Sequence, residues 1–230
     1  MPHPRARKSN DKMENRLSPL HDSIAPLNPR WAVVHAMQVP VQMEGDTHAT
    51  PVQLSDASCL PRMGVKGAKA EAWLVSQGMQ VPPGINSWVR SPEGTLIARL
   101  ARTEFFLEDR AGATTVERLN GILAPASGVS PVPRQDGALV LYGRSANDLL
   151  TQTCNVNFRT WTLEARTVVM TSMVGVSVLV IWEPYRELPR YRLWCDHTFA
   201  PYLWETLIEI ARELGGGAVG LQSLMPEVSG

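Results

Sequence analysis

The stretch that most restricts the fold is residues 199–214, "FAPYLWETLIEIAREL". Four large apolar side chains recur at the spacing i, i+4, i+7 and i+11, and therefore lie on one side of an α-helix: Leu203, Leu207, Ile210 and Leu214. Pro201 falls in the first turn, where its missing N–H costs no hydrogen bond, and Gly215 follows as a helix-ending residue. A helix with one apolar stripe must cover another layer, and we expect that layer to be a sheet.

The elements around this helix predict a mixture of strands and helices in both halves of the chain. In the first half, a strand and turn in "CLPRMGVKG" precede a helix over 68–77, a hairpin of "TLIARLAR" with "EFFLE", and a helix over 115–123. The second half predicts strand, helix, three strands, helix and a short last strand, over 138–143, 145–152, 167–172, 174–182, 191–195, 199–214 and 218–221. Both halves therefore indicate βαββαβ-type units of an α+β fold.

Composition suggests where these units begin and end. Residues 1–30 hold five prolines, six Lys/Arg and three Asp/Glu without helical or strand periodicity, which predicts a mobile amino-terminal arm. Residues 124–137, "APASGVSPVPRQDG", hold three prolines and two glycines, which is typical of a linker. We expect one unit over 31–123 and a second over 138–230.

Net charge and cysteine usage exclude some classes of partner. Lys and Arg number 22 and Asp and Glu number 22, so nothing in the composition favours nucleic acid or an anionic membrane. The longest apolar stretch, Val174 to Trp182, is too short for a membrane-spanning helix, and no signal-peptide core follows the amino terminus. Three cysteines without a C-x-x-C pair favour reduced thiols. We expect a cytoplasmic protein.

The segment "RMGVKG" raises the question of a phosphate-binding loop. It matches neither G-x-x-x-x-G-K-[ST] nor G-x-G-x-x-G, and a Gly-x-x-Gly nucleic-acid clamp is only a loose match in a neutral chain. We favour the interpretation in which Gly64 and Gly67 supply turn dihedrals and close packing.

Other residues with catalytic chemistry form no recognised constellation. Asp196 and His197 could act as an acid–base pair, but their place before the last helix favours a capping segment. Cys154 and Cys195 lie in apolar sequence surroundings, which favours packing over reactivity. The histidines show no spacing typical of metal ligands, so we expect no metal site and no catalytic residue.

The segment "RELPRYRLW" combines arginine with aromatic residues, as interface anchors do. Two interpretations stay open here, a solvated edge strand and a docking patch for a partner protein. The candidate interface residues are Arg186, Arg190, Tyr191, Arg192 and Trp194.

Three segments together resemble a known family. "LSDASCLPRMGVKGAKAEAWLVSQG" (54–78) resembles the amino-terminal strand–turn–helix of folate-dependent aminomethyltransferases, typified by the glycine-cleavage T-protein. "YRLWCDHTFAPYLWETLIEIARELGGG" (191–217) resembles the closing segment of the gamma subunit of heterotetrameric sarcosine oxidase, and "LYGRSANDLLTQTCNVNF" (141–158) is similar to the strand, helix and Cys-containing turn between them.

The resemblance implies a fold of two ferredoxin-like α+β units with antiparallel sheets, the T-protein-like folate-binding fold. In larger relatives such units frame a tetrahydrofolate pocket with an acidic residue after an Asn-rich loop. Here Glu108 and Asp109 stand where that loop would lie. The K-G-C-Y-x-G-Q-type signature of the folate-binding relatives linked to iron–sulfur proteins does not occur.

The resemblance also implies a function, an accessory gamma-type subunit that carries no cofactor of its own. The complex would oxidatively demethylate sarcosine and pass the one-carbon unit to tetrahydrofolate, with FAD, FMN and NAD on alpha, beta and delta partner subunits. The alternative is a free-standing folate-binding aminomethyltransferase-like protein, with tetrahydrofolate as its candidate ligand.

Overall fold

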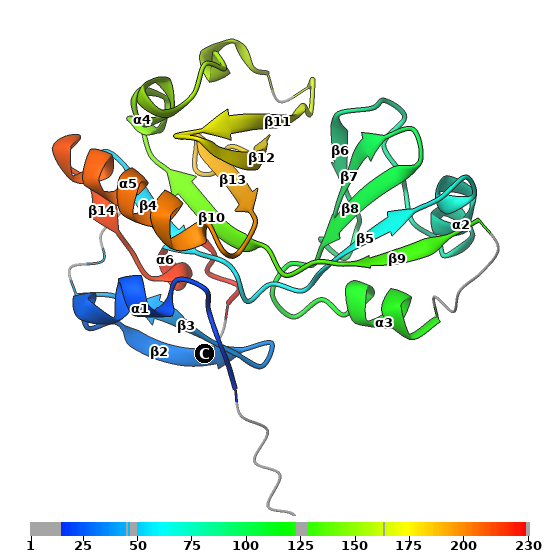
Figure 1. Ribbon diagram of the computed structural model, residues 1–230, viewed down its shortest axis with the longest axis horizontal. Coiled ribbons are helices and arrows are strands. Elements are labelled where there is room, and N and C mark those ends of the chain that lie inside the picture. Colours follow the sequence, from blue (N-terminus) through cyan, green and yellow to red (C-terminus); the bar gives the residue numbers. More distant parts are fainter. Residues whose placement is uncertain (1–14, 45, 47–49, 123–127, 163, 229–230) are drawn as a thin grey trace, which may run out of the picture.

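The computed structural model describes residues 15–44, 46, 50–122, 128–162 and 164–228. Within these ranges the chain forms a five-stranded, a six-stranded and a three-stranded sheet with helices packed on them (Figure 1). None of the helices in these ranges is long and apolar enough to cross a membrane.

The five-stranded sheet is antiparallel and has the order β6-β7-β8-β5-β9. Its elements are β5 (Arg62–Lys66), α2 (Ala70–Ser76), β6 (Ser87–Arg90), β7 (Leu96–Ala101), β8 (Glu104–Glu108), α3 (Thr115–Ile122) and β9 (Ser130–Pro133). Without the edge strand β6, the order β7-β8-β5-β9 with helices after β5 and β8 is the ferredoxin-like arrangement. The predicted hairpin and both predicted helices of this half are confirmed.

The six-stranded sheet has the order β11-β12-β13-β10-β4-β14. Its strands are β4 (Gln53–Asp56), β10 (Gly137–Tyr142), β11 (Val168–Met173), β12 (Val176–Trp182), β13 (Arg190–Cys195) and β14 (Gly217–Ala218), and its helices are α4 (Ala146–Thr153) and α5 (Ala200–Glu213). A second ferredoxin-like order is present, with β4 inserted between β10 and β14. All neighbours are antiparallel except β4 and β14, which run parallel.

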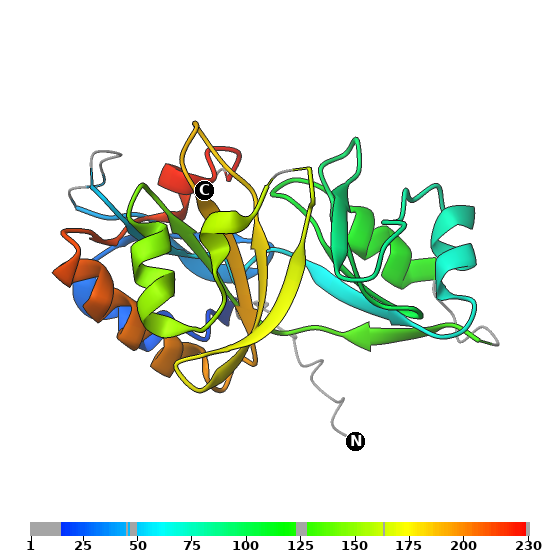
Figure 2. The ribbon, with the colours of Figure 1, turned by 90° about the horizontal axis from the view of Figure 1, so that it is seen from above.

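The two larger sheets turn one face toward each other and carry helices on their outer faces (Figures 1 and 2). Side chains alternate between the faces of a strand, so each strand contributes to two cores. On β8, Phe105 and Leu107 pack under α2 and α3, while Phe106 packs with Trp194 of β13, at a ring-centroid distance of 5.1 Å. The outer face of the six-stranded sheet packs under α4 and α5, where Leu203 and Leu207 are fully buried. The α+β fold class and the sheet under the last helix are confirmed.

The amino-terminal region differs from the predicted mobile arm. Residues before Asn15 lie outside the described ranges, but the following residues form β1 (Arg16–Leu17), α1 (His21–Ile24), a 3-10 helix (Ala25–Leu27) and the start of β2 (Arg30–Val34). With β3 (Met37–Gln42) they build the three-stranded sheet β1-β3-β2, and Leu20 and Ile24 are fully buried. The prediction of an arm through residue 30 is therefore wrong from residue 15 onward, because these apolar side chains pack against the six-stranded sheet and α5.

The predicted linker and unit boundaries also differ from the structure. Residues 123–127 lie outside the described ranges, but Ser130–Pro133 form β9, which pairs with β5. Proline is tolerated on an edge strand, since its missing N–H removes no ladder bond there. In turn β4, from the predicted first unit, pairs with β10 of the second. The sheets therefore do not follow the expected division at 124–137. The remaining elements, the 3-10 helix Phe158–Thr160 and α6 (Leu221–Leu224), lie in loops, and α6 replaces part of the predicted last strand.

Candidate functional site

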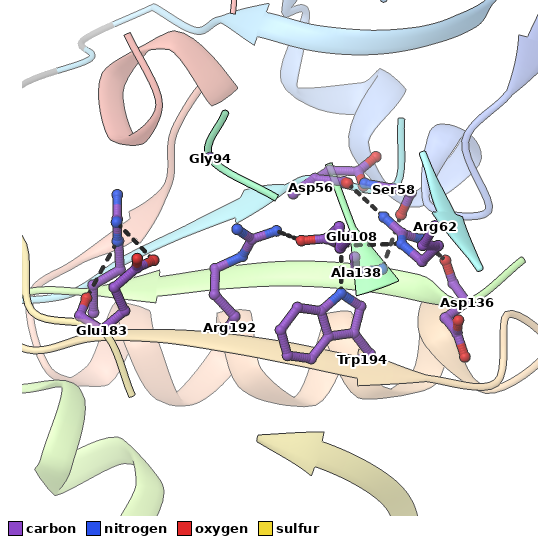
Figure 3. A network of polar contacts seen from close by, with 12 residues as sticks. Asp56, Ser58, Arg62, Gly94, Glu108, Asp136, Ala138, Glu183, Arg192 and Trp194 are labelled. Carbon is purple, nitrogen blue, oxygen red and sulfur yellow. Dashed lines mark hydrogen bonds and ion pairs between the residues drawn. The ribbon is translucent and has the colours of Figure 1, made fainter. Parts of the chain in front are cut away.

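A buried carboxylate, Glu108, lies between the facing sheets (Figure 3). Its side chain is 1% exposed and accepts hydrogen bonds from Arg62 Nε at 3.0 Å, from Trp194 Nε1 at 2.6 Å and from Arg192 Nη2. The two arginine side chains are 2% and 3% exposed. Burial lowers the pKa of Arg192, while the neighbouring Glu108 opposes that shift. The carboxylate of Glu108 is thus shielded from water and bound by two guanidinium groups and one indole N–H.

Strand alternation explains why these side chains meet. Glu108 lies two residues after Phe106 on β8, and Arg192 lies two residues before Trp194 on β13, so each pair shares one face of its strand. Both faces are the inner ones, which turn toward the other sheet. The contact therefore joins the five-stranded sheet to the six-stranded sheet.

Arg62 connects this group to the segments that cross between the sheets. Its Nη1 donates to the carbonyl of Asp136 at 2.6 Å, before β10, and its Nη2 donates to the carbonyl of Ala57 at 2.9 Å, after β4. One guanidinium thus ties both crossing segments to Glu108, and Figure 3 shows its contacts with Glu108 and Asp136.

A second carboxylate, Glu183, repeats the pattern nearer the surface. It pairs with Arg90 of β6 at 2.7 Å and with Arg190 of β13 at 3.0 Å, so it too bridges the sheets. Burial by itself would raise the pKa of Glu183, but the guanidiniums of Arg90, Arg190 and Arg192 outweigh it and the pKa is lowered from 4.5. The folded protein therefore holds this group in its charged form.

The lowered pKa predicts a pH dependence of stability. A carboxyl whose folded-state pKa lies below its unfolded value stabilises the fold above the unfolded value, and this stabilisation is lost as pH falls through the folded value. We expect Glu183→Gln to lower the free energy of unfolding most at about pH 7, with the difference from wild type shrinking below about pH 4.5. Urea titrations at both pH values measure it, with the exposed Glu209→Gln as control. A difference that grows on acidification would contradict the prediction.

Two further buried acids have structural partners. Asp56, fully buried, accepts hydrogen bonds from Ser18 Oγ and from the Ser58 amide, and burial raises its pKa. Asp109 accepts from Thr95 Oγ1 at 2.7 Å and from the Val116 amide at 2.8 Å, which caps the first turn of α3. Both carboxylates are thus engaged in holding neighbouring segments together.

Two cavities flank the segment Arg134–Asp136 that leads into β10. The first, which we call the interlobe cleft, has a volume of about 550 Å³ and opens between the inner faces of the two large sheets. The second has a volume of about 530 Å³ and lies between β1, α3 and the same segment. Both are lined by Arg134 and Asp136, which form an ion pair at 2.9 Å.

Comparison with solved structures identifies this arrangement of sheets. The chain superposes on glycine cleavage system aminomethyltransferase T from Bartonella henselae with a TM-score of 0.70 and 16% identity, over 91% of this chain and 60% of that one. The fold is T-protein-like. It also superposes on heterotetrameric sarcosine oxidase from Corynebacterium sp. U-96, solved in complex with pyrrole 2-carboxylate, with a TM-score of 0.63 and 19% identity, over 88% of this chain and 97% of that one. No protein-family model and no curated protein matches the sequence.

The T-protein-like fold places the candidate interface residues in different environments. Tyr191, Arg192 and Trp194 are 1%, 2% and 1% exposed, and Arg190 is engaged with Glu183. Of the five, only Arg186 is exposed, where it stacks on Tyr185. The predicted docking patch is therefore wrong for the buried three, because β13 is a central strand covered on both faces.

The same fold shows what "RMGVKG" does. These residues form β5 and the turn after it, and Gly67 has φ +128°. A Cβ at Gly67 would lie 2.2 Å from the carbonyl oxygen of Gly128, and one at Gly64 would lie 2.9 Å from the Val132 Cβ. Lys66 pairs with Glu104 at 3.0 Å. Close approach, of backbone at Gly67 and of the Val132 side chain at Gly64, therefore explains the glycines, in agreement with the interpretation of turn dihedrals and close packing.

Gly67→Val should lower the free energy of unfolding by at least about 1 kcal/mol, because it combines a strained φ with a backbone clash. Lys66→Ala should be nearly neutral, since its ion pair is solvent-exposed. Gly78→Ala separates the two causes, because Gly78 has φ +79° but a Cβ added there would meet no atom within 4 Å. Thermal melts compare the variants. A normal melt for Gly67→Val, or a Lys66→Ala protein that loses tetrahydrofolate affinity in calorimetry, would overturn the interpretation.

The remaining sequence candidates have structural roles. Asp196 accepts hydrogen bonds from the Thr198 amide at 2.8 Å and from its hydroxyl at 2.6 Å, which shapes the turn before α5. The N-cap of α5 is Phe199 and has no side-chain cap bond, so Asp196 does not itself cap the helix. Burial raises the pKa of Cys195 to about 12 and also raises that of Cys154, so both thiols stay protonated. In the described part of the chain, no group of three His, Cys, Asp or Glu could hold a metal ion.

Proposed function

We propose that this chain is the accessory, gamma-type subunit of a heterotetrameric sarcosine-oxidase-like complex. The complex would oxidatively demethylate sarcosine and transfer the one-carbon unit to tetrahydrofolate. The superposition on a chain of heterotetrameric sarcosine oxidase, over 88% of this chain and 97% of that one, carries the proposal.

The interior acids support a role without catalysis in this chain. Glu108 and Glu183 are each bound by two arginines, and Asp109 caps α3. A general acid or base needs a carboxylate within reach of substrate, and these are committed to the fold. We therefore assign FAD, FMN and NAD to alpha, beta and delta partner subunits, and place the complex in the cytoplasm, in keeping with three free thiols.

A free-standing folate-binding aminomethyltransferase-like protein is the alternative, favoured by the presence of the interlobe cleft. The charge of the cleft disfavours it. Three carboxylates, from Glu104, Asp136 and Asp196, and one guanidinium, from Arg134, line the cavity. Tetrahydrofolate ends in an anionic glutamate, which such a lining does not attract. We expect folate to be bound with partner chains rather than by this chain alone.

Affinity purification of the tagged chain from its native cell tests the proposal. Flavoprotein subunits that co-purify in fixed proportion support it. A chain that elutes alone as a monomer from all conditions contradicts it, and calorimetry with tetrahydrofolate then tests the alternative.

The purified chain alone should be colourless and should oxidise no sarcosine. The one G-x-G-x-x-G string in the sequence, residues 215–220, follows helix α5 instead of a strand and so lacks the strand–loop–helix setting of a dinucleotide-binding site. The proposal assigns the flavins to other subunits. An absorption spectrum and an oxygen-consumption assay check this after gel filtration. A flavin spectrum that stays with the chain would refute it.

A further inference from the structure

The outer edge of the six-stranded sheet has unused hydrogen-bonding groups. β11 is the terminal strand, and the two-residue loop of Val174 (φ 45°) and Gly175 (φ 87°) joins it to β12. In such a hairpin Met173 and Val176 form a hydrogen-bonded pair, so the N–H and C=O of Met173 point toward β12. The N–H and C=O groups of Ser172, Met170 and Val168 therefore point the other way, out from the edge of the sheet. The contact of the Val168 amide with the carbonyl of Asn86, at 2.8 Å, agrees with this parity. The next outward residues, Met170 and Ser172, have no outward backbone partner among the described residues.

This edge lacks the devices that protect other edges. Residues 167–173, "TVVMTSM", contain no charge and no proline, and pairing with β12 shows no bulge. By contrast the edge strand β9 contains Pro131 and Pro133, and β14 has only two residues. Proteins usually block long uncharged edges, so an open one indicates a place where another strand is added.

The open edge lies beside the interlobe cleft. Met170 is 62% exposed and lines the cleft with Leu100, Leu179 and Trp194. Of the three carboxylates in the cleft lining, Glu104 pairs with Lys66 and Asp136 with Arg134. The third, Asp196, has no ion pair with Lys or Arg among the described residues, is 61% exposed and has a lowered pKa. The site therefore combines strand pairing, an apolar surface and negative charge.

We propose that β11 adds, as a further strand, an extended segment of a partner subunit with an apolar side chain flanked by Lys or Arg. The apolar side chain packs on Met170 and Leu100, and a basic one lies near the carboxylate of Asp196. A second copy of this chain fits less well. The bridge between Ser87 and Thr167 already occupies the start of this edge, so only the remainder of β11 is open to pairing, which suits a short segment better than the edge of another sheet.

Hydrogen exchange in the native complex tests the proposal, which rests on the proposed function because it requires a partner chain. Amides of residues 168–173 are compared between the purified chain and the complex isolated through the tagged chain. Met170 and Ser172 should exchange rapidly in the chain alone and at least about tenfold more slowly in the complex. Met170→Lys should reduce recovery of the partner chains by about tenfold, since an edge charge opposes strand addition. Ser172→Pro, which removes an outward N–H, should do the same.

Val75→Lys on α2 is the matched control, because Val75 is also an exposed apolar residue, at 55%, and lies away from β11. Melting temperatures confirm that each variant is folded. A complex whose β11 amides stay unprotected overturns the inference and leaves the proposed function standing. Absence of any partner chain from the wild-type purification overturns both. Protection that appears in the purified chain and grows with its concentration assigns the edge to a second copy, and also overturns the inference.

Discussion

Replacing Leu207 with aspartate should prevent stable folding of this chain. Leu207 lies in the middle of α5 and is fully buried between the helix and the outer face of the six-stranded sheet. The substitution removes a large apolar side chain and puts a carboxylate without a partner in its place, which costs several kcal/mol. The free energy of unfolding of a whole domain is only about 5–15 kcal/mol, so a loss of this size removes much or all of it. Circular dichroism and a thermal melt measure the result.

The matched control for this variant is Glu209→Asp, which puts the same side chain into the same helix at an exposed position. It should change the free energy of unfolding by no more than about 0.5 kcal/mol, reporting only the lower helix propensity of aspartate. Equal melting temperatures for Leu207→Asp and Glu209→Asp would show that the apolar side of α5 is not a packing surface.

Local periodicity was enough to predict α5 and the β7–β8 hairpin. The apolar stripe of α5 and the alternation in "TLIARLAR" each reflect the packing of a single element on a neighbouring layer. A short stretch of sequence is enough to show such a pattern. The ferredoxin-like order of each half followed from the succession of such elements. The insertion of β4 beside β10 could not be predicted in the same way, because nothing near "QLSD" indicates which sheet it joins.

The interface prediction failed for a different physical reason. Arginines on a strand with aromatic residues indicate either a solvent-exposed edge strand or a docking patch. The sequence of β13 does not show that both faces of this strand are covered. Arg192 is buried because its partner Glu108 lies 84 residues earlier, on the other sheet. The sequence did contain one signal of this contact. The glutamate of "EFFLE" and the arginine of "RYRLW" each lie on the same strand face as large apolar side chains, and they have opposite charges. A charge on an otherwise apolar strand face is a reason to look for its opposite on another strand.

Proline content misled the prediction at both ends of the first unit. In 124–137 it marked an edge strand, β9, and before residue 30 it accompanied Leu20 and Ile24, which are fully buried. Composition averages over a window and misses two or three apolar anchors within it. The connection of Ser18 to the buried Asp56 is also long-range and has no local signature.

The buried charges have a consequence for how the proposed subunit works. Glu108 and Glu183 each hold one arginine from the five-stranded sheet and one from the six-stranded sheet. Ion pairs in an apolar interior are poor at adding net stability, yet they penalise any arrangement that separates their members. The two sheets are thereby held in one relative orientation, which would keep the interlobe cleft and the edge of β11 in a constant geometry for a partner chain.

Glu108→Ala should destabilise the protein by about 3–5 kcal/mol, because it leaves two buried guanidiniums without their carboxylate and the Trp194 indole N–H without its acceptor. Glu104→Ala is the control on the same strand, since Glu104 pairs with Lys66 at the surface and should cost no more than about 1 kcal/mol. Urea unfolding gives both values. A triple variant, Glu108→Leu with Arg62→Met and Arg192→Met, should recover much of the loss, because it removes the unpaired charges together with their partner. If Glu108→Ala costs no more than Glu104→Ala, the buried cluster does not hold the sheets; if the triple variant is as unstable as Glu108→Ala, the loss comes from packing rather than from uncompensated charge.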